Sequence, residues 1–355
     1  MEDEALDNNY NYDPKFSFNY GFPSEETLKI RNSLFRDCTK LGGLLLFYLL
    51  ITKLYAYIFY YATYGVLTGS ITLSFQAVRS YLTEEHQSLV TSTTYSMALN
   101  ASVTVLGLIT ILILSKTVLK MSFGSFFKTG SGNVKRAVVW MPACFVVNMI
   151  FSLAVSYLTE MLSYSGIAIP TPDFSVRSPG RAAIVLQILY VVVIAPVIEE
   201  VIYRGIILGT LSKYGNPAAI LLSALAFGLM HSNIPQAASA FAMGILFAVI
   251  AINCGSVVPT IIIHSLNNLI ANFSELTEPF DIPCCEQILN IVIIAAALVG
   301  FYVLFTRYSF LKYDTATALP QKGQVTKAVF SNPMVVLYLG YMVYTILVSI
   351  IKVNL

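Results

Sequence analysis

Nine apolar runs, separated by polar or charged stretches, dominate the pattern of the chain. A helix of about 20 apolar residues is long enough to cross the ~30 Å hydrocarbon layer of a membrane. The runs cover residues 41–67, 91–114, 137–158, 182–211, 217–231, 237–253, 257–273, 287–305 and 333–350. The three runs between residues 217 and 273 are shorter than most of the others. The pattern predicts an all-α polytopic membrane protein with about eight to nine transmembrane helices.

Residues 1–40 differ from the rest of the chain because they are polar, acidic and rich in Asn and Tyr. We interpret them as a cytosolic tail, with a short helix from Ser24, that precedes a transmembrane domain over residues 41–355. Residues 68–90 mix apolar and charged side chains. We expect them to form a loop with an interfacial helix.

The charges between the runs predict the orientation, because cytoplasmic loops of membrane proteins collect Lys and Arg. Two stretches are basic, one with Lys116, Lys120, Lys128, Lys135 and Arg136, the other with Arg307, Lys312, Lys322 and Lys327. Residues 274–286 are acidic and contain no Lys or Arg. With the N-terminus in the cytoplasm, both basic stretches lie inside and the acidic one lies outside. The Glu199–Arg204 end of its run also lies on the cytoplasmic side.

The composition agrees with a membrane protein, since 56% of the residues are hydrophobic and 11% are charged, against about 25% charged in soluble domains. The net charge of +2 gives no indication of a nucleic-acid partner, and no basic stripe with interleaved aromatic residues is present. The five cysteines have neither metal-ligand nor redox spacing.

The run at residues 182–211 is interrupted by Glu199, Glu200 and Arg204. An ionised carboxylate at bilayer depth costs roughly 2.5–3.5 kcal/mol on insertion scales, so it is kept where it is paired, faces water or takes part in chemistry. Glu200 and Arg204 are four residues apart and share one helix face, which predicts an ion pair. Glu199 is rotated by about 100° from Glu200, so it points elsewhere and lacks that partner.

Two of the three histidines lie in later runs: His231 ends the run 217–231, and His264 lies within the run 257–273. Asn268 follows His264 by one turn and shares its helix face. Taken singly, each of these groups is equally typical of hydrogen-bonded packing between helices. Taken together with Glu199, they predict one polar intramembrane cavity, because ionisable residues in membrane helices face the interior of the bundle.

Such a cavity suits hydrolysis. A carboxylate and a histidine can deprotonate a water molecule, and a histidine and an asparagine can donate hydrogen bonds to an oxyanion. An alternative interpretation makes Glu199, His231 and His264 the ligands of a catalytic zinc ion. Neither the H-E-x-x-H zinc signature nor a G-x-S-x-G elbow is present.

Three motifs, in order, resemble those of a known family. They are Glu199-Glu200-x-x-x-Arg204, Phe227-x-x-x-His231 and His264-x-x-x-Asn268. This pattern resembles the CAAX prenyl protease and bacteriocin-processing (CPBP, Abi-like) family of intramembrane glutamic endopeptidases. The resemblance covers about residues 182–273, which we take as the catalytic core. It implies a helical membrane enzyme with a conical cavity open to the cytosol and, laterally, to lipid.

The resemblance also implies a role for each residue. Glu199 and His231 would activate water, and His264 and Asn268 would form the oxyanion hole. Glu200 and Arg204 would support the site. No cofactor is expected under this scheme, and zinc is the alternative.

We therefore expect an intramembrane endopeptidase that cleaves a prenylated or membrane-associated protein or peptide near the cytoplasmic face. Its partners would be membrane lipids and a peptide or lipidated protein substrate. Two other functions fit the same residues: a non-catalytic peptide-binding or immunity membrane protein, and a proton-coupled transporter. The short spans favour a bacterial plasma membrane over the endoplasmic reticulum.

Overall fold

The computed structural model describes residues 24–127, 131–170, 181–273, 284–321 and 323–354, whose regular elements are all helices. In chain order they are α1 (Glu25–Thr68), α2 (Phe75–Ser80), η2 (Tyr81–Glu85), α3 (Gln87–Val90), α4 (Thr93–Val118), η3 (Phe123–Ser125), α5 (Ser131–Tyr164), α6 (Arg181–Ile188), η4 (Leu189–Ile194), α7 (Ala195–Glu200), η5 (Val201–Leu208), α8 (Gly209–Leu211), α9 (Asn216–Leu229), α10 (Ile234–Cys254), α11 (Val258–Ala271), α13 (Cys285–Thr306), η7 (Tyr308–Leu311), α14 (Gln324–Phe330) and α15 (Pro333–Asn354). The predicted all-α fold is confirmed.

Seven helices among the described residues are long and apolar enough to cross a membrane. They lie within Glu25–Thr68, Thr93–Val118, Val134–Tyr164, Ala182–Leu211, Ile234–Cys254, Gln287–Thr306 and Pro333–Ile351. The predicted number of eight to nine included α9 and α11, which have 14 residues each. At 1.5 Å per residue these two helices are about 21 Å long, which is shorter than the hydrocarbon layer. The chain is therefore a polytopic membrane protein whose described residues include seven helices of spanning length and two shorter apolar helices, α9 and α11.

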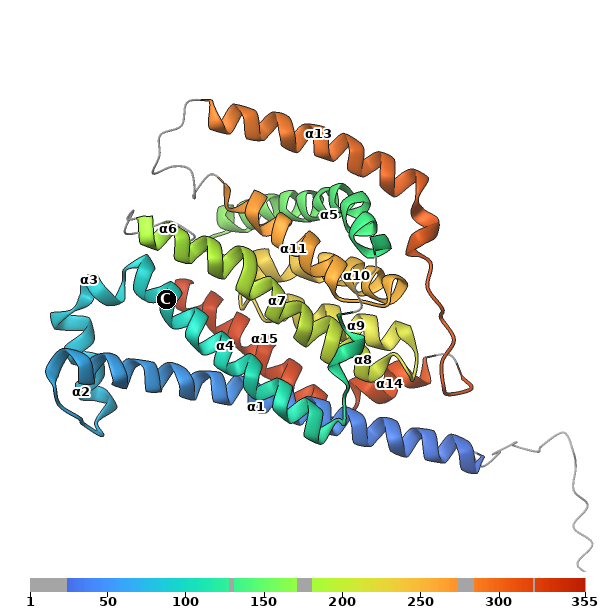
Figure 1. Ribbon diagram of the computed structural model, residues 1–355, viewed down its shortest axis with the longest axis horizontal. Coiled ribbons are helices and arrows are strands. Elements are labelled where there is room, and N and C mark those ends of the chain that lie inside the picture. The colour runs from blue at the N-terminus through green and yellow to red at the C-terminus, as the bar shows by residue number, and fades with distance from the viewer. Residues whose placement is uncertain (1–23, 128–130, 171–180, 274–283, 322, 355) are drawn as a thin grey trace, which may run out of the picture.

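The short helices lie in the middle of the bundle (Figure 1). Figure 1 shows α1, α4 and α15 along one side, α5 and α13 along the other, and α7, α9, α10 and α11 between them. Helix α10 packs against both α9 and α5, and α11 packs against α5 and α7. The segments with the three sequence motifs therefore meet at the centre of the molecule.

The predicted boundary of the N-terminal tail at residue 40 differs from the structure. Residues 1–23 lie outside the described part, but α1 begins at Glu25 and continues without a break to Thr68. Leu34, Cys38 and Leu41 are fully buried in the main hydrophobic cluster. Their spacing of four and three residues puts them on one helix face, so residues 25–40 are part of the packed bundle.

Several charges used for the predicted orientation lie outside the described residues, namely Lys128, Lys322 and the acidic stretch 274–283. The described cations of the two basic stretches lie near the end of the molecule where α4 and α10 finish. The Nζ of Lys40 donates to the carbonyl of Val118 at the end of α4, and Arg136 donates to the carbonyl of Asn253 at the end of α10. This basic end is also where α10 and α4 finish.

Candidate active site

A polar cavity of about 330 Å³ lies at the junction of α5, α7, α9, α10 and α11. Its lining includes four of the six predicted site residues: Glu199, His231, His264 and Asn268. The other lining residues are Asn148, Ser152, Ser156, Val191, Phe227, Pro235, Gln236, Ser239, Ala240, Met243, Phe247, Asn267, Ala271 and Asn272. The structure therefore brings the three motif segments to one cavity.

Glu200 and Arg204 form a fully buried ion pair beside this cavity. Nη1 of Arg204 donates to Oε1 of Glu200 at 2.8 Å, and both side chains have no solvent-exposed surface. The Arg204 guanidinium also lies 4.2 Å from the ring centre of Phe227 and 5.2 Å from that of Phe247. These contacts hold the carboxylate of Glu200 in a position with no solvent-exposed surface. The predicted pair is confirmed.

A close approach of two helices supplies a further acceptor for Arg204. Nη2 of Arg204 lies 3.4 Å from the carbonyl oxygen of Gly244 on α10. A Cβ atom at position 244 would lie 2.9 Å from the Cα of Ala224 on α9. Glycine is therefore required where α9 and α10 cross, and that crossing brings the Gly244 carbonyl to the arginine.

His264 contacts both carboxylates of the Glu-Glu pair. Its Nδ1 lies 3.1 Å from Oε1 of Glu200, and its Nε2 lies 3.7 Å from Oε2 of Glu199. Because Oε1 of Glu200 is an acceptor that also receives the hydrogen bond from Arg204, Nδ1 of His264 must carry a proton. The ring is thereby fixed with Nε2 towards Glu199.

Glu199 is the accessible member of the carboxylate pair. Its side chain is 15% exposed, against none for Glu200, and it lines the cavity. The expectation that Glu199 points away from the Glu200–Arg204 pair agrees with this geometry. The expectation that Glu199 acts with His231 does not follow from a direct contact, since the ion-pair contact of Glu199 in the described part of the chain is with His264.

His231 presents one nitrogen to the cavity. Its Nδ1 lies 3.0 Å from the carbonyl oxygen of Phe227 and 3.3 Å from that of Gly228. Carbonyl oxygens only accept, so Nδ1 donates and Nε2 keeps its lone pair. The rings of His231 and His264 each lie 5.5 Å from the ring of Phe227, edge to face. Phe227 therefore sets the position of both histidines.

Asn268 is held by a distortion of the helix opposite it. Residues 189–194 form a π-helical turn, in which the backbone N–H of Ala195 donates to the carbonyl of Tyr190, five residues earlier. The corresponding donor for the next carbonyl, that of Val191, would be residue 196, which is proline and has no N–H. Nδ2 of Asn268 donates to this carbonyl at 3.0 Å. One N–H of the Asn268 amide remains for the cavity.

Sequence reasoning missed the contribution of α5. Asn148, Ser152 and Ser156 line the cavity from this helix, and Asn148 donates to Oδ1 of Asn267 on α11 at 3.3 Å. The signal was present in the sequence, since three polar residues at intervals of four share one face of an otherwise apolar span. Asn272 on the opposite wall was likewise missed.

Glu199, His231 and His264, the three ligands of the zinc alternative, all line the polar cavity. In the described ranges, no group of three or more His, Cys, Asp and Glu side chains is arranged so that it could hold a metal ion. Nδ1 of His264 donates to Glu200, and Nδ1 of His231 donates to backbone carbonyls. Nε2 is therefore the remaining nitrogen of each ring.

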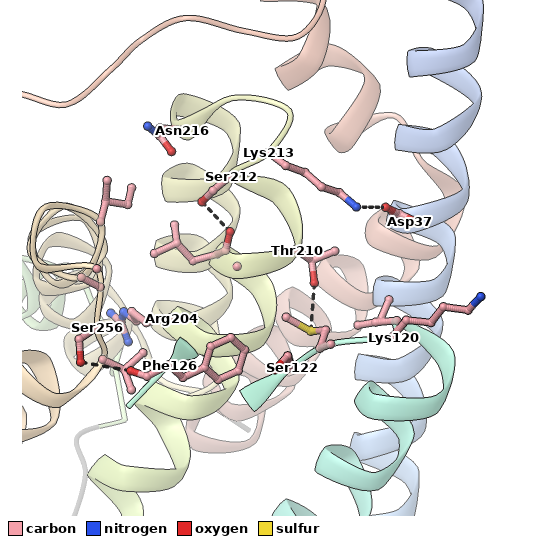
Figure 2. A pocket seen from close by; sticks show the side chains of 18 residues that line it. Asp37, Lys120, Ser122, Phe126, Arg204, Thr210, Ser212, Lys213, Asn216 and Ser256 are labelled. Atoms are coloured by element: carbon pink, nitrogen blue, oxygen red, sulfur yellow. Dashed lines mark hydrogen bonds and ion pairs between the residues drawn. The ribbon is translucent and has the colours of Figure 1, made fainter. Parts of the chain in front are cut away.

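A second cavity, of about 510 Å³, lies at the basic end of the molecule, between the ends of α4, α8 and α10 (Figure 2). Its charged side chains have separate partners or directions: Lys213 pairs with Asp37, 2.7 Å away, and Lys120 points away from the cavity. Arg204 also lines this cavity and pairs with Glu200. Burial alone would lower the pKa of Lys213, but the hydrogen bond and the attraction to Asp37 raise this pKa above its usual value.

The two cavities follow one another along α10. Pro235, Gln236, Met243 and Phe247 line the polar cavity, whereas Ala251, Ile252 and Gly255 at the end of the helix line the second one. Arg204 lines the second cavity and pairs with Glu200, so this buried ion pair lies between the two cavities.

Comparison with known families identifies the central segment. Residues 181–270 match the family described as type II CAAX prenyl endopeptidase Rce1-like, and this segment contains all three motifs. The match confirms the family resemblance, and because the family is one of proteases, it supports peptidase activity in a multi-pass membrane protein. No match was found among curated proteins or among solved structures.

Proposed function

We propose that this chain is an intramembrane endopeptidase that hydrolyses a peptide bond in a prenylated or membrane-associated protein or peptide. The observation that carries the proposal is the position of Glu199. Its carboxylate lines a polar cavity next to Nε2 of His264, while the neighbouring Glu200 is neutralised by Arg204. A carboxylate that lines the cavity and is not bound to Arg204 is available as a general base.

Glu199 and His231 act on the attacking water. Glu199 accepts a proton from the water as its oxygen attacks the peptide carbonyl carbon, and the lone pair on Nε2 of His231 accepts a hydrogen bond that orients the water. The proton on Glu199 then passes to the leaving nitrogen when the C–N bond breaks. The products are one carboxylic acid and one amine, and Glu199 returns to its ionised form.

His264 and Asn268 stabilise the oxyanion of the tetrahedral intermediate. With a proton on Nε2 as well as Nδ1, His264 carries one positive charge. The buried set of Glu199, Glu200, Arg204 and His264 is then neutral, which suits a site of low polarity. Nε2–H of His264 and the second N–H of Asn268 donate to the oxyanion, a contribution of about 10²–10³ in rate for one such donor.

Glu200 and Arg204 position the ring of His264. The carboxylate of Glu200 accepts a hydrogen bond from Nδ1–H of His264, and the ion pair with Arg204 holds that carboxylate in place. This arrangement is similar in logic to a hydrolase triad, in which a buried carboxylate fixes the tautomer and orientation of a histidine.

The proposal is tested with purified protein in detergent and a pool of ten-residue peptides, one half farnesylated at a cysteine and the other half plain. The reaction runs in water enriched in ¹⁸O, and products are identified by mass spectrometry. Hydrolysis predicts two fragments, of which the newly formed carboxylate carries ¹⁸O. Cleavage by wild type and not by Glu199→Gln supports the proposal.

Equal cleavage by both proteins would assign the activity to another group or to a contaminant. Peptide that is bound by wild type but released intact would favour the non-catalytic binding function. Proton-dependent uptake into proteoliposomes without cleavage would favour the transporter.

A further inference from the structure

The α5 wall of the polar cavity carries a row of three polar side chains: Asn148, Ser152 and Ser156. They are spaced by four residues within a span that is otherwise apolar enough to cross a membrane. Polar side chains in such a helix are unfavourable unless they find hydrogen-bond partners or face a polar cavity. The proposed chemistry uses none of the three.

The serine hydroxyls of this α5 row differ from other hydroxyls in the bundle in their hydrogen bonds. Thr52, Thr63 and Thr110 each donate to the carbonyl four residues earlier in their own helix. Ser152 instead lies 3.3 Å from the hydroxyl of Ser239, which itself donates to the carbonyl of Pro235. Ser156 is exposed, and its hydroxyl makes no hydrogen bond to another described residue.

Asn272 supplies an independent observation on the α11 wall. Its side chain is 6% exposed and lines the same cavity. Its Nδ2 donates to the backbone carbonyl of Asn268 at 2.8 Å, but its Oδ1 is buried without a partner in the described part of the molecule. A buried acceptor left unsatisfied costs about 1–3 kcal/mol. This oxygen lacks an N–H donor.

The spacing of the row matches the backbone of an extended peptide. Residues four apart on a helix rise by about 6 Å, and residues two apart on a strand rise by about 6.6–6.8 Å. An extended backbone offers both an N–H for Asn272 Oδ1 and carbonyls for the serine hydroxyls. A helical segment cannot do so, because its backbone groups already bond to one another.

We propose that the α5 row and Asn272 bind the backbone of an unwound, extended polypeptide segment, whatever its side chains, and so position it for Glu199. The inference rests on the proposed function only where it says that the segment is positioned for Glu199, because the binding itself requires no cleavage. It identifies the substrate class as a chain that is non-helical at the site.

The first experiment measures binding in the Glu199→Gln background, with the same pool of farnesylated and plain ten-residue peptides carrying photo-leucine. Light-induced adducts are located by mass spectrometry. We expect adducts within residues 148–156 and 267–272. Ser156→Ala and Asn272→Ala should each lower the apparent affinity by about 3- to 10-fold, as for one lost hydrogen bond. The matched control is Ser163→Ala, also on α5, whose hydroxyl donates to the carbonyl of Glu160; its apparent affinity should stay within twofold of that of the parent protein.

A second experiment distinguishes backbone recognition from packing of α5 against its neighbours. In a series of peptide analogues, one backbone N–H at a time is replaced by an ester oxygen. At the position whose N–H faces Asn272, the ester and Asn272→Ala should each lower the affinity, and the two losses of affinity should not be additive. Additive losses of affinity at every ester position would overturn the inference. In the first experiment, adducts that are absent from residues 148–156 and 267–272 would also overturn it, as would an adduct yield that Ser156→Ala and Asn272→Ala do not change.

The two proposals fail in different ways. Row-dependent adducts without cleavage by wild type would contradict the protease and leave the binding site standing. Cleavage by wild type with a KM and kcat that Ser156→Ala and Asn272→Ala do not change would leave the protease standing and overturn the binding site.

Discussion

At the scale of single residues, the site depends on the different surroundings of two adjacent carboxylates. The spacing of Glu200 and Arg204 was sufficient to predict their pairing, and the structure places Nη1 of Arg204 2.8 Å from Glu200. The contact of His264 with both Glu199 and Glu200 was not predictable. It depends on how α11 approaches α7, and no pattern within one helix contains that information.

Glu200→Gln should lower both stability and activity. The variant leaves the guanidinium of Arg204 buried without its counter-charge, which destabilises by about 3–5 kcal/mol. Loss of the charge that orients His264 should lower kcat by about 10²–10⁴-fold. The single tryptophan, Trp140, is buried and stacked on Phe310, so its fluorescence reports unfolding in detergent.

The double variant Glu200→Gln/Arg204→Met separates the two effects. The apolar methionine side chain removes the unpaired charge, while the amide oxygen of the introduced glutamine still accepts from Nδ1 of His264, so most of the lost stability should return. The activity should stay low because the carboxylate is absent. Recovery of activity together with stability would show that the pair has only a structural role.

At the scale of elements, the positions of the apolar runs were sufficient to predict the helices. The run 182–211 coincides with the observed span Ala182–Leu211. The π-helical turns within it were not predicted, although Pro196 was the available signal. Proline removes one N–H, and the freed carbonyl of Val191 then needs a donor from another helix. That donor, Asn268, could be identified only once α11 had been placed.

Pro196→Ala should therefore impair catalysis more than folding. Residue 196 would gain an N–H that competes with Asn268 for the carbonyl of Val191, so the Asn268 amide would lose its fixed orientation. We expect kcat to fall by about 10-fold or more, because an oxyanion donor contributes up to 10²–10³. KM and the unfolding midpoint from Trp140 fluorescence should change little. An unaltered kcat in Pro196→Ala would show that the π-helical turn does not contribute to catalysis.

At the scale of the whole molecule, the two ends differ in charge and in the cavity that they carry. Lys120 and Lys213 border the cavity at the basic end, and Ser156 and Gln236 lie in the polar cavity at the other end. Sequence alone predicted the orientation from the loops, but it could not show which end of the bundle the site faces. That depends on where the short helices α9 and α11 stop within the membrane.

The positive-inside rule places the basic end in the cytoplasm, so the polar cavity should be reached from the opposite side. In intact cells, a membrane-impermeant maleimide should label Ser156→Cys, whereas Lys213→Cys should react only after permeabilisation. Peptide mapping by mass spectrometry separates these sites from the native cysteines. The reverse pattern of labelling would place the site on the cytoplasmic side, as the family resemblance implied.

The central claim is that the carboxylate of Glu199 activates water, and the most direct measurement is kcat for Glu199→Gln on one identified peptide. Gln cannot accept the proton, so kcat should fall by at least ~10³-fold, while the Trp140 unfolding midpoint stays close to that of wild type. Glu160→Gln, on the exposed end of α5, is the matched control and should keep full activity. A kcat for Glu199→Gln within tenfold of wild type would contradict the account.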